Sequence, residues 1–170
     1  NDNHNFKTLN KLDLIGFYRA GLYYNDIDKK KNFPLVLEKK DIRIGFLNYT
    51  MDSAFYDFGE ENVNFFRIDS VRKDIKRAKD MLVDYLILYM DWKDIPDSMK
   101  LSLNVELVNL GVDVIVGTGQ KGFTTADLLN FSGGSKKIIV NNIGAINSDS
   151  NSRETNKSAI VEIVLKKHKR

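Results

Sequence analysis

The stretch Val83-Asp84-Tyr85-Leu86-Ile87-Leu88-Tyr89-Met90 is followed at once by Asp91-Trp92. This apolar run is interrupted only by Asp84, and its branched and aromatic residues are typical of a strand that is buried on both faces. A second run, Val-Asp-Val-Ile-Val at residues 112–116, ends at Gly117. A helical pattern lies between the two runs. Strands and helices that alternate in this way predict an α/β layered fold.

The remaining segments extend this alternation in both directions. Three amphipathic helices are predicted, at residues 6–21, from Asp69 through Leu82, and from Ser98 to Gly111. A turn or helix is expected around residues 26–31, and a short helix from Thr124 or Thr125 to Leu129. Further strands are predicted at residues 22–24, in a hairpin of residues 34–38 and 41–47, and at residues 136–140 and 159–165. Residues 51–66 show no periodic pattern of apolar residues and are interpreted as a long irregular segment outside the regular elements.

Composition predicts one domain that spans residues 1–170, with residues 147–158 as a mobile loop because they contain no apolar anchor. A hydrophobic share of 42% is sufficient for a core at this length. The 26 basic and 23 acidic residues nearly cancel, and the basic clusters are short and scattered, so no nucleic-acid partner is expected. The absence of cysteine excludes disulfides, cysteine zinc sites and thiol catalysis.

No apolar run approaches the roughly 20 residues that span a bilayer. The chain opens on Asn1 without a methionine and enters a motif at once, so we expect an N-terminal part to be missing. Any association with a membrane would then come through that missing segment.

The glycine-rich stretch Gly117-Thr118-Gly119-Gln120-Lys121-Gly122 fits the G-x-G-x-x-G spacing of a dinucleotide site. Such a site also needs a helix after the loop and an acidic residue for the ribose. The following helix candidate is short, and the strand at residues 136–140 ends in Asn141-Asn142. An ordinary loop between a strand and a helix is therefore favoured, and binding of a nucleotide through Gly117, Gly119 and Gly122 is the weaker alternative.

Two places offer ligand types for a divalent metal. Asp2-Asn3-His4 brings together a carboxylate, an amide oxygen and an imidazole. Asp91 follows a predicted buried strand, where open α/β sheets place functional groups. The alternative is structural: Asn3 or Asn5 caps a helix, His4 lies on the surface, and Asp91 caps a turn.

Six segments together resemble a known family, and their order carries the specificity: Asn3-His4 with the helix after it, and residues 42–49, 69–80, 83–92, 107–117 and 136–144. Residues 107–117, for example, resemble a Leu-x-x-x-Gly-Ala-Asp-x-Val-x-Gly block. In this order they resemble the bacterial capsule synthesis family associated with poly-gamma-glutamate. The domain of that family is similar to calcineurin-type metallophosphatases. The resemblance implies a layered metallophosphatase-like sandwich that lacks its N-terminal part.

The departures from that family fall on its metal ligands. Asp91 stands where the family has a histidine, and Thr118, Gly119 and Lys121 stand in the family's Gly-His-His-Pro-His block. The family's first metal-binding aspartate would precede Asn1. The resemblance therefore implies a degenerate metal site.

The expected function is a role in poly-gamma-glutamate capsule biosynthesis at the bacterial cell surface, by binding or assembly. The expected partners are poly-gamma-glutamate or capsule assembly proteins, and no organic cofactor is expected. The alternative is a metal-dependent hydrolase that retains one weakly bound divalent ion through Asn3, His4 and Asp91.

Overall fold

The computed structural model describes residues 2–52, 54, 58–59, 61–93, 95–119, 122–130, 136–144 and 158–166. Its centre is a six-stranded mixed sheet with the order β1-β2-β3-β4-β6-β5. The strands are β1 (Leu35–Lys39), β2 (Ile42–Thr50), β3 (Tyr85–Asp91), β4 (Val114–Thr118), β5 (Ala126–Asn130) and β6 (Lys136–Val140). Strands β2, β3, β4 and β6 are parallel, and β1 and β5 pair antiparallel at the two edges. The predicted α/β class is confirmed, and it agrees with a metallophosphatase-like domain.

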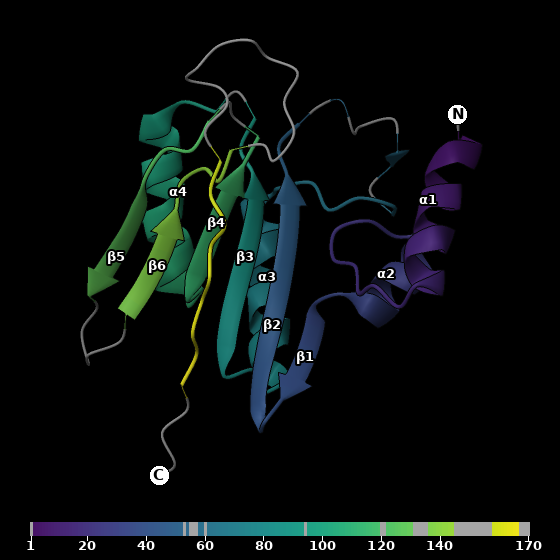
Figure 1. The fold of residues 1–170 in the computed structure, drawn as a ribbon, viewed down its shortest axis with the longest axis horizontal. Coiled ribbons are helices and arrows are strands. Elements are labelled where there is room, and N and C mark those ends of the chain that lie inside the picture. Colours follow the sequence, from purple (N-terminus) through teal and green to yellow (C-terminus); the bar gives the residue numbers. More distant parts are fainter. Residues whose placement is uncertain are drawn as a thin grey trace.

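Two helices cover one face of the sheet, α3 (Ile68–Asp80) and α4 (Asp97–Leu110) (Figure 1). Because side chains alternate along a strand, every second residue of β3 faces these helices. These β3 residues join the buried core with side chains of both helices: Leu86, Leu88 and Met90 with Val71, Ile75, Ala78, Leu107 and Val108. The two helices connect successive parallel strands, so the carboxyl ends of those strands lie at the same edge of the sheet.

The two N-terminal helices lie beside the β1 edge, α1 (Asp2–Leu14) and α2 (Asp26–Asn32) (Figure 1). The prediction of one helix over residues 6–21 is wrong at both ends. Gly16 has a φ of +78° and its amide bonds to the carbonyl of Asp13, while the amide of Phe17 bonds to the carbonyl of Leu12. This pair of bonds is a Schellman motif, which ends the helix although apolar residues recur beyond it. Tyr18, which the periodic pattern placed on the buried face, is 73% exposed.

The starts of α3 and α4 differ from the predicted caps. Helix α3 begins at Ile68 after Arg67, and α4 begins at Asp97 after Pro96, without a side-chain cap in either case. The predicted stop at Gly111 is confirmed, since this residue has a φ of +110° and adopts the left-handed conformation. The predicted strands at residues 42–47, 83–90 and 112–116 are confirmed as β2, β3 and β4.

Two predicted elements have another structure. The short helix expected to reach Leu129 is the strand β5, because these residues pair antiparallel with β6 and this tertiary pairing overrides the local capping signal of Thr124 and Thr125. The strand expected at residues 22–24 is a single bridge between Leu22 and Val63.

The segment at residues 158–166 is extended but pairs with no strand in a ladder. The prediction of a strand at residues 159–165 is therefore wrong. Its alternation is real: Ala159, Val161, Ile163 and Leu165 are half-buried, and the residues between them are exposed. The segment runs along the face of the sheet opposite α3 and α4 (Figure 1). At its start the amide of Ala159 donates to the carbonyl of Ile143, and at its end the hydroxyl of Tyr85 donates to the carbonyl of Lys166. Most of the loop predicted at residues 147–158 lies outside the described residues.

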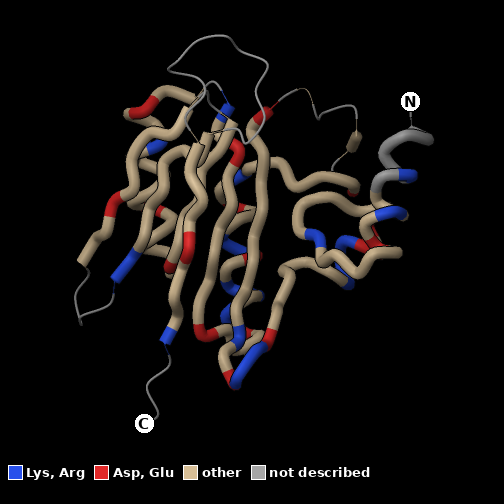
Figure 2. Tube along the Cα trace, in the orientation of Figure 1, with Lys and Arg blue, Asp and Glu red and all other residues tan. Residues whose placement is uncertain are grey.

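Charged positions of both signs are interspersed along the chain, and the central strands carry few of them (Figure 2). Within the described ranges, every helix is too short or too polar to cross a lipid bilayer.

Candidate functional site

Polar side chains occupy equivalent positions at the carboxyl ends of three neighbouring strands. Thr50 of β2 is the register partner of Asp91 on β3, and Asp91 is the partner of Thr118 on β4. Two residues earlier on each strand, Asn48 is the partner of Tyr89. Partners in a parallel ladder point to the same face. These side chains therefore lie together on the face of the sheet opposite α3 and α4.

They line a pocket of about 240 Å³ that we call the edge pocket. Its wall is completed by two segments that approach the ends of the strands from outside the sheet. The full lining is Ala20, Gly21, Leu22, Asn48, Tyr49, Thr50, Val63, Asn64, Tyr89, Asp91 and Thr118. The segment at residues 63–65 is held there by backbone bonds between Thr50 and Asn64 and between Phe66 and Thr50. The pocket thus lies where an open α/β sheet places its functional groups.

Asp91 is the one acidic residue among the residues that line the edge pocket. Its Oδ2 accepts a hydrogen bond of 2.9 Å from the hydroxyl of Thr50, and its Oδ1 accepts a long contact of 3.4 Å from the amide of Lys93. A carboxylate has about four lone-pair sites. Oδ1 therefore retains the capacity to accept a stronger hydrogen bond from a ligand.

The basic side chain of Lys93, two residues after Asp91, is paired with another acid. Nζ of Lys93 lies 2.7 Å from Oδ2 of Asp52. The hydrogen bond from Lys93 lowers the pKa of Asp52, and a bond from the amide of Ala54 adds to the effect. The positive charge of Lys93 is therefore compensated by Asp52 and is not available to Asp91 alone.

Gly117 near the end of β4 and Gly119 just after it have a structural explanation. A Cβ at Gly119 would lie 2.0 Å from Oδ1 of Asp91, and Gly119 has a φ of +92°. A Cβ at Gly117 would lie 2.1 Å from the carbonyl oxygen of Asn141 and 2.6 Å from Nε1 of the buried Trp92. Both positions therefore need glycine for close packing of the loop against β3 and β6.

The same loop does not have the architecture of a dinucleotide site. It leads into β5 instead of a helix, so no helix N-terminus follows it to receive a pyrophosphate. Gln120 and Lys121 lie outside the described residues.

Asn3 and His4 lie in the first turn of α1, and their side chains are outside the described part of the structure. Figure 1 shows α1 next to α2 beyond the β1 edge, while β3 lies in the middle of the sheet. A single-ion site that combines Asn3 and His4 with Asp91 therefore stays a prediction.

The donors of the edge pocket do not fit a dinuclear metal centre. Asp91 is accompanied there by the hydroxyls of Thr50 and Thr118 and by the amide of Asn48, whose nitrogen donates to the carbonyl of Ala20. Two divalent ions held close together need several carboxylate and imidazole ligands. Within the described ranges, the His, Asp and Glu side chains form no group of three that could hold a metal ion.

The sequence pattern did not predict Thr50 and Asn48 as site residues, because the predicted strand ended at Leu47. Polar residues at its end look like the start of a loop, whereas in the structure β2 continues to Thr50 because residues 44–50 pair with β3. The signal that was available is position: both residues directly follow a predicted strand, as Asp91 does.

Comparison with known proteins identifies one family. The family described as bacterial capsule synthesis protein PGA_cap matches residues 5–125, from α1 through β4 and the strand ends of the edge pocket. No curated protein matches the sequence. The family match covers more than half of the 170 residues. The chain belongs to the bacterial capsule synthesis protein family.

Proposed function

We propose that this capsule synthesis protein acts by binding the capsule polymer or an assembly partner, and that it does not use a dinuclear metal centre for hydrolysis. The observation that carries the proposal is the donor set of the edge pocket. Asp91, its one carboxylate, accepts from the Thr50 hydroxyl and is flanked by neutral side chains. Such groups can recognise a ligand by hydrogen bonds, but they cannot compensate the charge of two metal ions.

Poly-gamma-glutamate is the polymer that we propose, with the bacterial cell surface as the place of action. Each of its residues contributes one amide and one carboxylate. Asp91 repels a carboxylate but can accept a hydrogen bond from an amide N–H through Oδ1. We therefore expect the amide chain of the polymer, not its carboxylates, to lie against Asp91.

The test measures calorimetric binding of poly-gamma-glutamate to the purified chain at physiological ionic strength. Asp91→Ala removes the acceptor and should weaken binding roughly tenfold, as expected for a hydrogen bond to a charged group. Asp80→Ala is the matched control, because Asp80 is an exposed acid on α3 whose only ion pair is with Lys76 among the described residues. Equal affinity of the wild type and Asp91→Ala would exclude the edge pocket as the polymer site.

A second arm addresses the metal-dependent alternative. Elemental analysis is combined with hydrolysis of a generic phosphodiester in the presence of manganese, and we expect little or no turnover. Two tightly bound equivalents, with turnover lost in His4→Ala, would establish the hydrolase instead. One weak equivalent that is lost in both His4→Ala and Asp91→Ala would show the single-ion site.

A further inference from the structure

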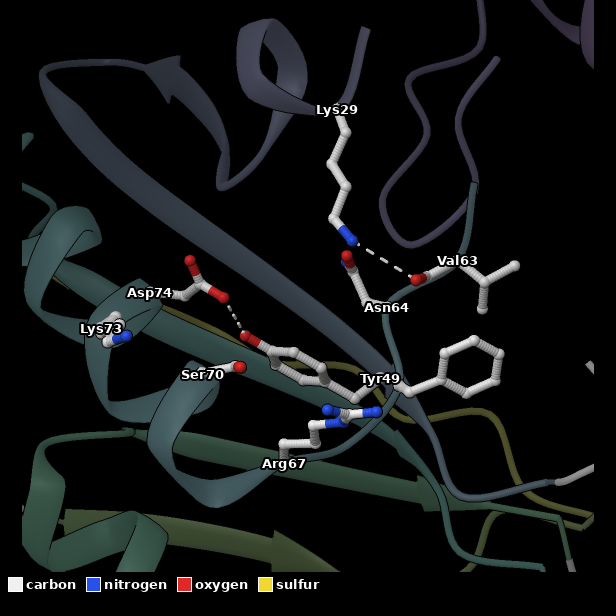
Figure 3. Close-up of a pocket in the computed structure, with 9 residues that line it drawn as sticks. Lys29, Tyr49, Val63, Asn64, Arg67, Ser70, Lys73 and Asp74 are labelled. Atoms are coloured by element: carbon white, nitrogen blue, oxygen red, sulfur yellow. Dashed lines mark hydrogen bonds between the residues drawn. The ribbon is translucent and has the colours of Figure 1, made fainter. Parts of the chain in front are cut away.

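A second cavity, of about 220 Å³, lies between α2, the end of β2 and the start of α3, and we call it the cationic cavity (Figure 3). Its lining gathers more basic side chains than acidic ones. The lining residues are Lys29, Tyr49, Val63, Asn64, Phe65, Arg67, Ser70, Lys73 and Asp74. We propose that the cationic cavity binds an oxyanion, a carboxylate or phosphate group of a ligand, through Lys29, Arg67 and Lys73.

The three cations reach the cavity from two separate elements. Ser70 and Lys73 are three residues apart at the beginning of α3, so they share one face of that helix, and Arg67 directly precedes it. Lys29 extends from α2 on the opposite side, above Asn64 (Figure 3). A group that enters the cavity is therefore approached by positive charge from two directions.

The position of Lys29 is fixed by its surroundings. Its Nζ donates a hydrogen bond of 3.3 Å to the carbonyl of Val63 and lies 6.0 Å from the ring centroid of Tyr23. An ammonium carries three N–H donors, and the bond to Val63 uses one of them. Because this side chain is already ordered, binding costs less conformational entropy there.

Asp74 is the one acidic side chain in the lining of the cationic cavity. Its Oδ2 accepts a hydrogen bond of 2.8 Å from the hydroxyl of Tyr49. One negative charge is thus tied to a buried tyrosine, while Lys29, Arg67 and Lys73 carry three positive charges. The excess of two positive charges favours an anion, and Ser70 adds a hydroxyl donor.

The cationic cavity and the edge pocket share the residues Tyr49, Val63 and Asn64. A ligand of sufficient length can therefore contact both. The oxyanion site follows from the lining of this cavity and does not depend on the proposed polymer binding. Loss of one activity in a variant need not change the other, so the two proposals can fail separately.

The test is a titration of the full chain with inorganic phosphate and, separately, with the dicarboxylate glutarate, followed by amide shifts in ¹H–¹⁵N NMR spectra. Ionic strength is kept constant with sodium chloride. We expect saturable shifts at the amides of Asn64 and Lys73. Tighter binding of phosphate would identify a phosphate group as the ligand, and tighter binding of glutarate would identify a carboxylate.

Three variants separate this site from a general effect of charge. Lys73→Gln should weaken binding roughly fivefold, the scale of one partly exposed charge pair. Lys76→Gln removes the same charge from the same helix outside the lining, where Lys76 pairs with Asp80, and should leave the affinity unchanged. Asp74→Asn removes the opposing charge and should strengthen binding roughly fivefold.

The strengthening by Asp74→Asn matters most, because a variant that fails to fold cannot bind more tightly. Shifts that do not saturate, or equal losses in Lys73→Gln and Lys76→Gln, would overturn the proposal. Weaker binding in a folded Asp74→Asn variant would overturn it as well.

Discussion

The hydroxyl of Thr50 donates a hydrogen bond of 2.9 Å to Oδ2 of Asp91, across the carboxyl ends of β2 and β3. The same Thr50 oxygen accepts a bond of 3.0 Å from the amide of Asp52. The chain that leaves β2 is therefore tied to the carboxylate at the end of β3. This link orients Asp91 and leaves its Oδ1 toward the loop after β4, where Gly119 lies close to it.

Thr50→Val tests this link, because valine keeps the shape and loses the donor. We expect the free energy of unfolding to fall by about 1–2 kcal/mol, since Asp91 loses a hydrogen bond to a charged group. Urea unfolding of both proteins measures the difference. Thr118→Val is the control. Thr118 is the register partner of Asp91 on β4, but within the described part of the chain its hydroxyl makes no hydrogen bond to Asp91. An equal loss in both variants would show that the Thr50–Asp91 bond contributes nothing specific.

Local patterns were sufficient to predict the core of the fold. The apolar run at β3 and the helical period of α3 each report directly on which side chains are buried, so both elements were found. Asp91 was predicted for a related reason, because the end of a buried parallel strand is a recurrent functional position. The helix that ends at Leu14 shows where the periodicity of apolar residues fails to predict a helix end. A single left-handed glycine, Gly16, ends the helix regardless of the apolar residues beyond it.

Features that depend on distant pairing were not predicted. Leu129 lies in a strand because β6 is available to pair with it, and nothing in the local sequence reports this partner. The cationic cavity exists only because the fold brings residues of α2 and α3 together, so the sequence alone shows Lys29 and Lys73 as separate charges. The link from Thr50 to Asp91 likewise exists only once β2 and β3 are in register.

Leu82 provides a test of backbone strain. It follows α3 with a φ of +58° and is 72% exposed. Glycine adopts this left-handed conformation without the clash that a Cβ causes, and little apolar burial is lost. We expect Leu82→Gly to raise the free energy of unfolding by about 1 kcal/mol, as measured by thermal and urea unfolding.

The matched control for Leu82 is Leu101, another leucine that is 66% exposed but lies inside α4. Leu101→Gly should lower the free energy of unfolding by about 1 kcal/mol, because glycine is a poor helix former. Changes of the same sign in both variants would contradict the assignment of strain to Leu82.

Arg19 connects the end of α1 to α2. Its guanidinium lies 2.7 Å from Oδ1 of Asp13 and 2.8 Å from Oδ2 of Asp28, and it also donates to the carbonyl of Leu22. The hydrogen bond from Arg19 lowers the pKa of Asp13. For Asp28, burial acts to raise the pKa, but the bonds from Arg19 and the amide of Tyr24 prevail and lower it.

We expect Arg19→Gln to lower the free energy of unfolding by about 2 kcal/mol, because the half-buried Asp28 loses its charged partner. The lowered pKa values of Asp13 and Asp28 mean that this contribution is present above their unfolded pKa values and is lost as the pH falls through the folded ones. The variant should therefore differ less from the wild type in acid. Arg72→Gln removes exposed pairs with Asp69 and Glu106 and should cost less than about 1 kcal/mol. Hydrogen exchange in α1 that is unchanged by Arg19→Gln would argue against this connection.

Asp74 should make the protein less stable as its carboxyl ionises. Burial raises the pKa of Asp74 above its ordinary value of 3.8, and the hydrogen bond from Tyr49 and the charge of Lys29 only partly oppose this effect. A raised pKa in the folded state means that folding favours the protonated form. The stabilising contribution is therefore fully present below the unfolded pKa and is lost as the pH rises through the folded pKa.

Asp74→Asn keeps an acceptor for Tyr49 and cannot ionise, so it should match the wild type in acid and exceed its stability toward neutral pH. Urea unfolding across this pH range measures the difference, with the exposed Asp80→Asn as the control. A difference between Asp74→Asn and the wild type that stays constant with pH would show that the Asp74 carboxyl is not raised by the fold.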